Sequence, residues 1–207
     1  MYKKPLIVFE GIETSGKTLH LDIVVRYLKK KKISFIKLRE PGGNYNSEKI
    51  RNLILNNGTD FNKITDLYLY LAARSENIEK VIKKNYNKKI ILIDRFIDST
   101  IAYQHYGMGL SKKIIDINNK FILDKIKIDF TFLNIVNSKN LFLRLKKRSK
   151  LNRYDKFKSK FYIKAQNGFI NIAKKNKKKY LIVNSNLELK KNKIIVMNRI
   201  KELLNIK

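Results

Sequence analysis

The segment Gly11–Thr18 constrains this chain more than any other part of its sequence. It reads GIETSGKT and matches the phosphate-binding loop pattern G-x-x-x-x-G-K-[ST] at every fixed position. The apolar run Pro5–Phe9 precedes it, as expected of a buried parallel strand, and helical spacing follows over Leu19–Lys30. This order of strand, glycine-containing loop and helix predicts a site for a phosphate group. A glycine turn that carries a lysine by chance is the alternative, and the flanking strand and helix argue against it.

Each part of this loop can contribute to phosphate binding. Backbone N–H groups can surround the phosphates, and the N-terminus of the following helix adds partial positive charge. Lys17 can reach the outer phosphates, and the Thr18 hydroxyl can hold a magnesium ion. The predicted ATP-binding residues are Gly11, Ile12, Glu13, Thr14, Ser15, Gly16, Lys17 and Thr18.

Length and composition limit the class of protein. The chain has 207 residues, enough for one domain with a full core, and we expect a single domain over residues 1–207. It has no cysteine, which excludes disulfides and thiolate metal sites and agrees with a reducing cytoplasm. No apolar run approaches the ~18 residues of a membrane span, and a strand is expected almost at the first residue. We therefore expect a cytoplasmic protein with no signal peptide and no membrane partner.

The formal net charge of +30 allows two interpretations. A nucleic-acid-binding protein would explain it, because basic patches attract phosphate backbones. However, the lysines are spread along the chain and are abundant in segments such as Ile33–Lys37 and Lys88–Ile93, which have the pattern of structural elements. Lys, Asn and Ile are encoded by codons rich in A and T. We therefore interpret the charge as compositional drift, and expect no specific nucleic-acid partner.

Strand-like and helical segments alternate along the chain. The expected strands are 5–9, 33–38, 90–93, 129–135 and 180–183, and the expected helices are 19–30, 47–55, 65–85, 100–106, 111–123, 138–147, 162–175 and 189–204. This alternation predicts an α/β fold with a five-stranded parallel sheet flanked by helices on both faces. We expect Ile90–Ile93, the most apolar short run, in the centre of the sheet. Ser47, and either Thr65 or Asp66, are the expected N-caps of their helices.

Polar residues follow the first three predicted strands. They are Glu10 and Glu13, then Arg39, then Asp94 and Arg95. Ligands of parallel sheets bind at the carboxyl ends of the strands, so these side chains are candidates for the site. Positioned guanidinium groups and magnesium suit a phosphoryl transfer between two nucleotides, where several negative charges lie side by side.

The loop by itself does not choose between GTPases, ATPases and small-molecule kinases. A GTPase would carry an Asn-Lys-x-Asp motif, and the nearest segment, Asn62–Thr65, lacks the Asp. The other motifs therefore decide. They are Phe9–Glu13, Arg39–Gly43, Ala72–Arg74, Asp94–Phe96, Ser99–Thr100 and Ala102–Gln104.

Together these motifs resemble those of bacterial-type thymidylate kinases, P-loop nucleoside monophosphate kinases, along almost the whole chain. The resemblance implies an enzyme that phosphorylates dTMP to dTDP for dTTP synthesis, with ATP as donor and Mg²⁺ as cofactor. It also implies a homodimer formed through helices, and a short basic lid at about residues 144–160.

The resemblance further implies residue roles in dTMP binding. Glu13 would meet the sugar 3′-hydroxyl, and Arg39 and Arg95 would grip the phosphate. Tyr103 would pack beneath the deoxyribose and leave no room for a 2′-hydroxyl. The residues implied around the base are Tyr70, which would stack on thymine, Arg74, which would bond its edge, and the polar Ser99, Thr100 and Gln104.

A second set of implied roles concerns phosphoryl transfer. Asp94 would lie near the magnesium and the phosphates, so Thr18 and Asp94 are the implied metal residues. Thr14 stands where the eukaryotic type has an arginine, and lid arginines would supply that charge. The implied catalytic residues are Lys17, Asp94, Arg95, Arg144 and Arg148. Two departures, Lys146 in place of a third lid arginine and Met108 between two glycines, put the turnover rate in question.

Two alternatives stay open at this point. A deoxynucleoside kinase shares an Asp-Arg-x motif, but a nucleoside has no phosphate for Arg39 to hold. A basic nucleic-acid-binding protein with a decayed loop would bind DNA tightly, in a salt-sensitive way, without nucleotide turnover.

Overall fold

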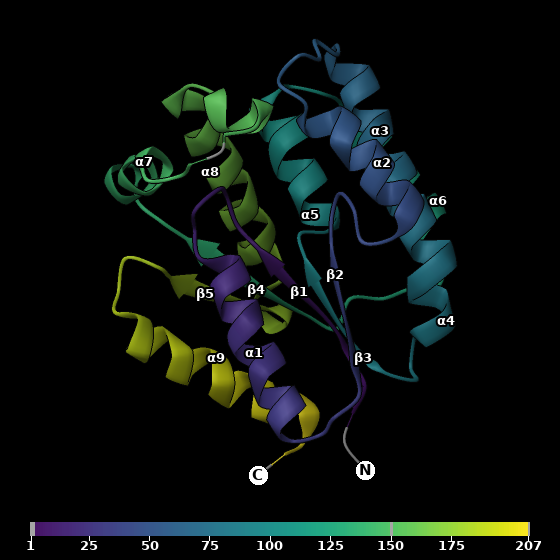
Figure 1. Cartoon of the computed structure of the whole chain (residues 1–207), viewed down its shortest axis with the longest axis vertical. Helices are drawn as coiled ribbons and strands as arrows, with labels where there is room; N and C mark the ends of the chain where they lie inside the picture. The colour runs from purple at the N-terminus through teal and green to yellow at the C-terminus, as the bar shows by residue number, and fades with distance from the viewer. Residues whose placement is uncertain (1–2, 150, 207) are drawn as a thin grey trace.

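A five-stranded parallel sheet forms the centre of the computed structural model, which describes residues 3–149 and 151–206. Met1, Tyr2, Lys150 and Lys207, which fall within the predicted domain and lid, lie outside the described residues. The strands are β1 (Leu6–Glu10), β2 (Phe35–Arg39), β3 (Ile90–Asp94), β4 (Phe130–Ile135) and β5 (Tyr180–Asn184) (Figure 1). Their order is β2-β3-β1-β4-β5, and every neighbouring pair is parallel. The predicted fold class is confirmed.

The prediction that Ile90–Ile93 forms the central strand is wrong. β1 lies in the centre, between β3 and β4, whereas β3 lies between β1 and β2. Both faces of β3 and of β1 are buried, so both strands are apolar up to the acidic residue that ends each of them, Asp94 in β3 and Glu10 in β1. Apolar content therefore cannot distinguish a central strand from its buried neighbour.

Helices occupy the segments between the strands, close to the predicted ranges. The α-helices are α1 (Lys17–Lys30), α2 (Tyr45–Leu55), α3 (Lys63–Asn77), α4 (Lys83–Asn85), α5 (Ile97–Thr100), α6 (Lys112–Leu123), α7 (Ser138–Lys146), α8 (Ser159–Lys175) and α9 (Leu189–Leu204). Two π-helical segments, η1 (Ile78–Ile82) and η2 (Ile101–Gly107), and two 3₁₀ segments, η3 (Arg153–Lys156) and η4 (Lys177–Lys179), complete the set. Among the described residues, no helix combines the length and apolar character that crossing a membrane requires.

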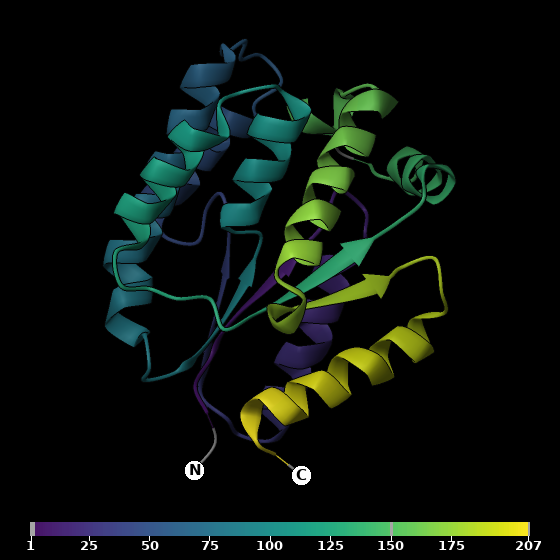
Figure 2. The same ribbon diagram turned by 180° about the vertical axis from the view of Figure 1, so that it is seen from behind.

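The helices form a layer on each face of the sheet. Along β1, Ile7 and Phe9 pack with α1 and α9, whereas Leu6 and Val8 point to the other face and pack with η1. Helix α8 and η2 cover the β4 side of this second face. Figure 1 shows α1 and α9 side by side at the lower end of the molecule, and Figure 2 shows α8 from behind. The carboxyl ends of the strands stay open for a ligand.

Two predicted N-caps are wrong, because an asparagine one turn earlier caps each helix. The Asn44 side chain accepts from the backbone N–H groups of Asn46 and Ser47, and the Asn62 side chain does the same at the start of α3. Ser47 instead donates its hydroxyl to the Ala73 carbonyl at 2.8 Å. Thr65 lies within α3, and Asp66 is buried. Asparagine is as good an N-cap residue as serine or aspartate. The apolar pattern alone therefore placed the starts of these two helices too late.

Two predicted helices are interrupted. The helix expected over 65–85 consists of α3, the π-helical η1 and α4, and the helix expected over 100–106 begins earlier, as α5, and continues as η2. π-helical segments often occur at functional sites. Here η2 carries Tyr103 and Gln104, two of the residues implied at the nucleotide.

Candidate active site

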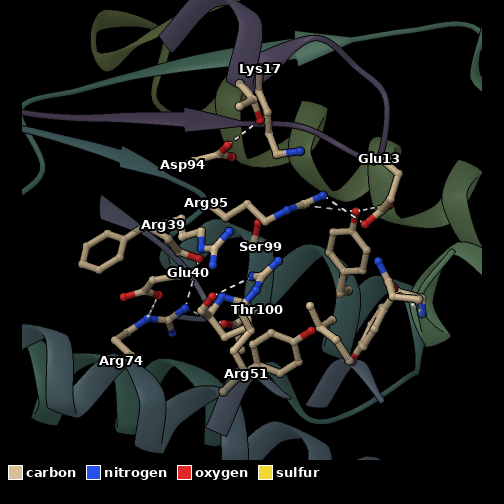
Figure 3. A pocket seen from close by; sticks show the side chains of 18 of the residues that line it. Glu13, Lys17, Arg39, Glu40, Arg51, Arg74, Asp94, Arg95, Ser99 and Thr100 are labelled. Atoms are coloured by element: carbon tan, nitrogen blue, oxygen red, sulfur yellow. Dashed lines mark hydrogen bonds and ion pairs between the residues drawn. The ribbon is translucent and has the colours of Figure 1, made fainter. Parts of the chain in front are cut away.

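A cavity of about 450 Å³ lies at the carboxyl ends of β1, β2 and β3 (Figure 3). The predicted site residues that line it are Glu13, Thr14, Lys17, Thr18, Arg39, Tyr70, Arg74, Asp94, Arg95, Ser99, Thr100, Tyr103, Gln104 and Arg148. The structure therefore brings together side chains from segments that are far apart in the chain. The remaining predicted residues are Gly11, Ile12, Ser15 and Gly16 of the loop, and Arg144, which lie outside this lining.

The loop Gly11–Thr18 has the backbone that phosphate binding requires. Gly11 and Gly16 have φ of 141° and 89°, and Thr14 also has a positive φ, 54°. A Cβ atom on Gly11 would lie 2.3 Å from the Asn134 carbonyl oxygen of β4. Only glycine fits this contact, so the loop is held tightly against the sheet.

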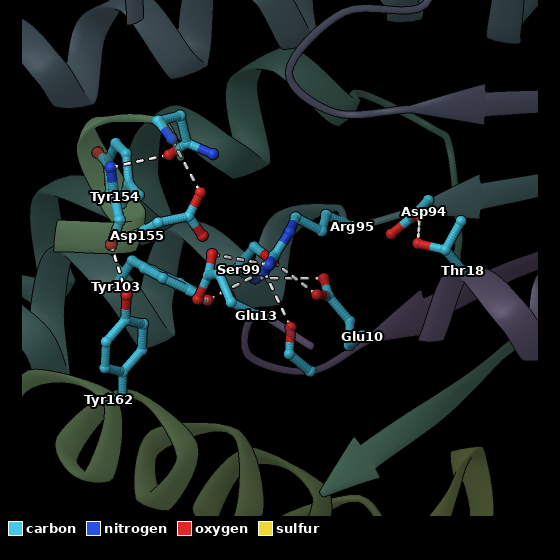
Figure 4. A network of polar contacts seen from close by, with 12 residues as sticks. Glu10, Glu13, Thr18, Asp94, Arg95, Ser99, Tyr103, Tyr154, Asp155 and Tyr162 are labelled. Atoms are coloured by element: carbon cyan, nitrogen blue, oxygen red, sulfur yellow. Dashed lines mark hydrogen bonds and ion pairs between the residues drawn. The ribbon is translucent and has the colours of Figure 1, made fainter. Parts of the chain in front are cut away.

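Lys17, Thr18 and Asp94 meet at the start of α1. Burial and, next, nearby Arg95 lower the pKa of the Lys17 amine to about 8, although Asp94, Glu13 and Glu10 oppose the shift. The Thr18 hydroxyl donates to Asp94 Oδ2 at 2.5 Å (Figure 4). The second carboxylate oxygen, Asp94 Oδ1, is buried and has no hydrogen-bond partner among the described residues. A desolvated amine and a partly unsatisfied carboxylate favour a ligand that brings both negative charge and a cation.

Arg95 is the centre of a polar network on the cavity wall. Its guanidinium donates to Glu13 Oε1 at 3.0 Å and to the Gly11 carbonyl at 2.9 Å. The Tyr103 hydroxyl donates to the other oxygen of Glu13 at 2.5 Å. Burial raises the pKa of the Tyr103 hydroxyl well above its ordinary value, so it stays a donor at neutral pH. Glu13, Arg95 and Tyr103 therefore hold one another in fixed orientations (Figure 4).

Arg39 faces the same cavity from the end of β2. It forms a two-pronged ion pair with Glu48 of α2, with N–O distances of 3.2 and 2.9 Å. Its side chain is still 55% exposed, so part of the guanidinium can meet a ligand. Arg51, one turn further along α2, also lines the cavity and donates to the Pro41 carbonyl at 2.7 Å. Sequence reasoning missed Arg51, because a lone arginine on a helix has the pattern of a solvated surface residue.

Arg74 is almost fully buried and largely satisfied by the protein. It donates to Glu40, Asn119 and Thr100 at 2.7 to 2.8 Å and to the Phe96 carbonyl at 3.1 Å. These bonds use four of the five N–H donors of a guanidinium. Arg74 thus joins α3, α5, α6 and the turn after β2, and one N–H donor is left for a ligand.

The aromatic side chains of Tyr70, Tyr103 and Tyr154 gather in one part of the cavity wall. The Tyr154 ring lies edge-on to Tyr70 and to Tyr103, with centroid distances of 5.9 and 6.0 Å. Gln104 Nε2 donates to the Tyr154 hydroxyl at 3.3 Å. The Tyr154 hydroxyl in turn donates to the buried Asp66. Sequence reasoning missed Tyr154, because its segment was noted only for its basic charge.

The two predicted lid arginines lie in different places. Arg148 lines the cavity and pairs with Asp155 of η3. Arg144, on α7, donates to the Thr14 carbonyl at 3.0 Å and to the Ser185 carbonyl at 2.7 Å. Arg144 therefore contacts the phosphate loop from outside the cavity, whereas Arg148 faces into it.

These features define the class of protein. A phosphate loop at the central strand of a 2-3-1-4-5 sheet faces guanidinium groups from the neighbouring strands across one nucleotide-sized cavity. Such an arrangement serves to hold two phosphorylated ligands end to end, and it is that of a P-loop nucleoside monophosphate kinase.

Comparisons with known proteins identify the family. A family model described as thymidylate kinase matches residues 9–194. The chain belongs to the thymidylate kinase family, which uses ATP, and its reaction is the phosphorylation of dTMP to dTDP. This confirms the activity that the sequence motifs implied. The two alternatives considered from the sequence, a deoxynucleoside kinase and a basic nucleic-acid-binding protein, are not supported.

Individual thymidylate kinases are similar in sequence to this chain over most of their length. The thymidylate kinase of Sulfurihydrogenibium sp. (strain YO3AOP1) is 33% identical over 198 residues, which cover 95% of this chain and 96% of that protein. The thymidylate kinase of Ehrlichia chaffeensis is 38% identical over 173 residues, covering 82% and 83%. The crystal structure of thymidylate kinase from Ehrlichia chaffeensis superimposes with a TM-score of 0.78 at 31% identity, over 95% of this chain and 98% of that one.

Proposed function

We propose that dTMP binds in the 450 Å³ cavity, with its phosphate between Arg39 and Arg95, and that ATP binds on the loop Gly11–Thr18. The observation that supports this most directly is the position of Arg95. Its guanidinium is fixed by Glu13 and by the Gly11 carbonyl, in the same cavity as Lys17. A phosphate beside Arg95 would therefore lie close to the loop that carries the donor.

The other end of the cavity suits the nucleoside. Tyr70 offers a ring face, and stacking on thymine would contribute about 1–3 kcal/mol. Glu13 and Tyr103 form the wall where the sugar would lie, so that Glu13 can accept from the 3′-hydroxyl and Tyr103 excludes a 2′-hydroxyl. Gln104 and the remaining N–H of Arg74 are the donors for the base edge. Ser99 and Thr100 support this wall through their bonds to Glu10 and Arg74.

The residues present fit a magnesium ion. Thr18 and Asp94 are hydrogen-bonded to each other, and Asp94 keeps one buried oxygen without a partner. No group of three or more His, Cys, Asp or Glu side chains that could hold a metal occurs among residues 3–149 and 151–206, so phosphates and water would supply the other ligands. Magnesium bound here would neutralise charge that develops on the phosphates.

Catalysis then consists of positioning and charge neutralisation. Lys17 and Arg95 stabilise negative charge from two sides, and Arg148 adds a third positive group from the lid. Arg144 acts from outside the cavity, by holding the loop through the Thr14 carbonyl. No strong general base is required, because the acceptor is already a phosphate anion.

A homodimer is the assembly that we propose. Five large apolar side chains on α3 and α6, two packed neighbouring helices, are 48–84% exposed: Ile64, Tyr68, Ile114, Ile117 and Phe121. An exposed apolar face of this kind favours association with a second copy. We also propose that residues 144–160 act as a lid within one domain, and that the enzyme works in the cytoplasm.

A panel of nucleoside monophosphates, tested with ATP and magnesium, examines the proposed site. We expect dTMP to be the preferred acceptor, and Arg95→Ala to lower turnover with dTMP at least about a hundredfold, as for loss of a positioned charge. Arg26→Ala, at an exposed position on α1, is the matched control and should retain activity. An unchanged rate in Arg95→Ala would remove Arg95 from the site.

A further inference from the structure

Glu10, the last residue of β1, is completely buried, and it has no part in the transfer described above. It does not line the cavity. Its Oε1 accepts from the backbone N–H groups of Phe96 and Ser99, at 2.7 and 3.2 Å, and its Oε2 accepts from the Ser99 hydroxyl at 2.6 Å (Figure 4). All three bonds go to the short segment that follows β3, and Arg95 belongs to that segment.

The backbone of Arg95 is in an unfavourable conformation. Its φ is 66°, in the left-handed region that residues other than glycine rarely adopt. Such a residue persists where the surrounding structure determines its position. Here the Arg95 N–H donates to the Phe9 carbonyl at 2.9 Å, and the next N–H, that of Phe96, donates to Glu10. Two adjacent residues of β1 therefore fix the peptide groups on either side of the Arg95 Cα.

We propose that Glu10 is the positioning residue for Arg95: its carboxyl group holds the start of α5, so that Arg95 stays left-handed and its guanidinium faces the dTMP phosphate. The proposal rests on the role proposed for Arg95. The N–H groups at the start of a helix have no acceptor within the helix, and α5, which continues into η2, begins at Ile97 with Phe96 as its N-cap. The side chain that accepts from these N–H groups therefore determines the position of the turn between β3 and α5, which contains Arg95.

The reach of Glu10, rather than its charge, is the property that matters in this proposal. Burial and, next, nearby Asp98 raise the pKa of the Glu10 carboxyl to about 8, so the neutral form contributes at neutral pH. Two variants separate reach from charge. Glu10→Gln keeps an oxygen in the same place but cannot ionise, and Glu10→Asp keeps an ionisable carboxyl but withdraws it by about 1.5 Å, one C–C bond.

The test compares the binding of dTMP and thymidine by titration calorimetry, because only dTMP carries the phosphate that Arg95 would hold. We expect Glu10→Asp to weaken the binding of dTMP at least about tenfold, as for the loss of one charge-assisted hydrogen bond between Arg95 and the phosphate. The affinity for thymidine should change less than about threefold. The separate variant Glu10→Gln should retain the preference of the wild type for dTMP over thymidine. As a control, Asp98→Asn alters a different buried carboxylate, which lies on α5 and accepts from Tyr180 at 2.7 Å. This variant should keep the preference for dTMP.

Other outcomes would overturn the proposal. Loss of the preference in Glu10→Gln with retention in Glu10→Asp would assign the effect to charge. Equal weakening of both ligands, or the same loss in Asp98→Asn, would make Glu10 a general support of the fold. Should Glu10→Asp fail to fold, Glu10→Gln decides alone, and loss of its preference overturns the proposal. If Arg95→Ala keeps the preference for dTMP, the failure lies in the role given to Arg95 and not in that of Glu10.

Discussion

At the scale of single residues, the site depends on side chains that are held by other side chains. Glu13 accepts from both Arg95 and Tyr103, and Arg95 also bonds to the backbone of the phosphate loop. Each group is thus oriented before a ligand arrives, which is how binding sites limit the cost of ordering. Tyr103 has two separable parts, a ring beside the proposed sugar position and a hydroxyl that orients Glu13.

Substitutions of Tyr103 should separate these two parts. Tyr103→Phe removes the bond to Glu13 but keeps the ring, so we expect KM for dTMP to rise about tenfold while the preference for the deoxy sugar is retained. Tyr103→Ala opens space for a 2′-hydroxyl, so the ratio of kcat/KM for dTMP over its ribose counterpart should fall at least about tenfold. Steady-state kinetics with both nucleotides measure this. Undiminished preference in Tyr103→Ala would refute the role of the ring.

Glu10 should also leave a mark on the pH dependence of stability. Burial raises its pKa from 4.5 to about 8 in the folded chain. Such a group favours folding below its ordinary pKa and loses that contribution as the pH rises through about 8. Between about pH 5 and pH 8, the free energy of unfolding of the wild type should therefore fall relative to that of Glu10→Gln. Urea denaturation at several pH values measures the difference, and parallel curves would contradict the shift.

At the scale of elements, η3 contributes Tyr154 to the part of the cavity proposed for the nucleoside, and it is anchored to α3. Asp66 of α3 is 2% exposed and accepts from both Arg153 and Tyr154. A buried carboxylate with two donors from another segment makes a strong point of attachment. The predicted lid is therefore joined to the helix that also carries Tyr70 and Arg74.

Asp66→Ala should release this attachment. It leaves the Arg153 guanidinium and the Tyr154 hydroxyl without an acceptor, so we expect the free energy of unfolding to fall by about 3–5 kcal/mol. Trypsin should cleave faster within 146–160, and KM for dTMP should rise. Asp116→Ala, which breaks an exposed pair with Lys112, is the control and should change stability by less than about 1 kcal/mol. Equal cleavage rates in the two variants would argue against an anchored lid.

The sequence predicted elements well wherever local pattern determines them. Gly11–Thr18, the five strands and α9 follow from glycine spacing, apolar runs and helical periodicity. Tertiary contacts determine the rest. Asp66 is buried because Arg153 and Tyr154 reach it from a segment far along the chain, and Arg51 faces a cavity that no local pattern defines. The π-helical turns η1 and η2 likewise depend on packing and not on a sequence signal.

At the scale of the whole molecule, the charge and the apolar face favour different behaviour. A net charge of +30 opposes close contact between copies at low salt. The exposed apolar side chains of α3 and α6 favour it, and Phe121 is 84% exposed. We expect hydrophobic association at short range to outweigh the repulsion between copies once salt screens the charges.

The oligomeric state should depend on Phe121. At about physiological ionic strength, with a Debye length of roughly 8 Å, we expect a dimer for the wild type and a monomer for Phe121→Asp. Ile194→Asp, which alters an equally apolar side chain on α9 that is 60% exposed, should remain dimeric. Sedimentation velocity measures this. A monomeric wild type, or dissociation of both variants, would contradict an interface on α6.

The sealed guanidinium of Arg74 has a consequence for how the pocket responds to its ligand. It ties the turn after β2, the first turn of α5 and the middle of α6 to one helix, with no water needed between them. We therefore expect the wall proposed for the base and the turn proposed for the phosphate to keep their relative positions when a ligand binds. Because Asp66 joins η3 to the same helix, we expect adjustment to an arriving nucleotide to be left to exposed side chains of the cavity, such as Arg39 and Arg148.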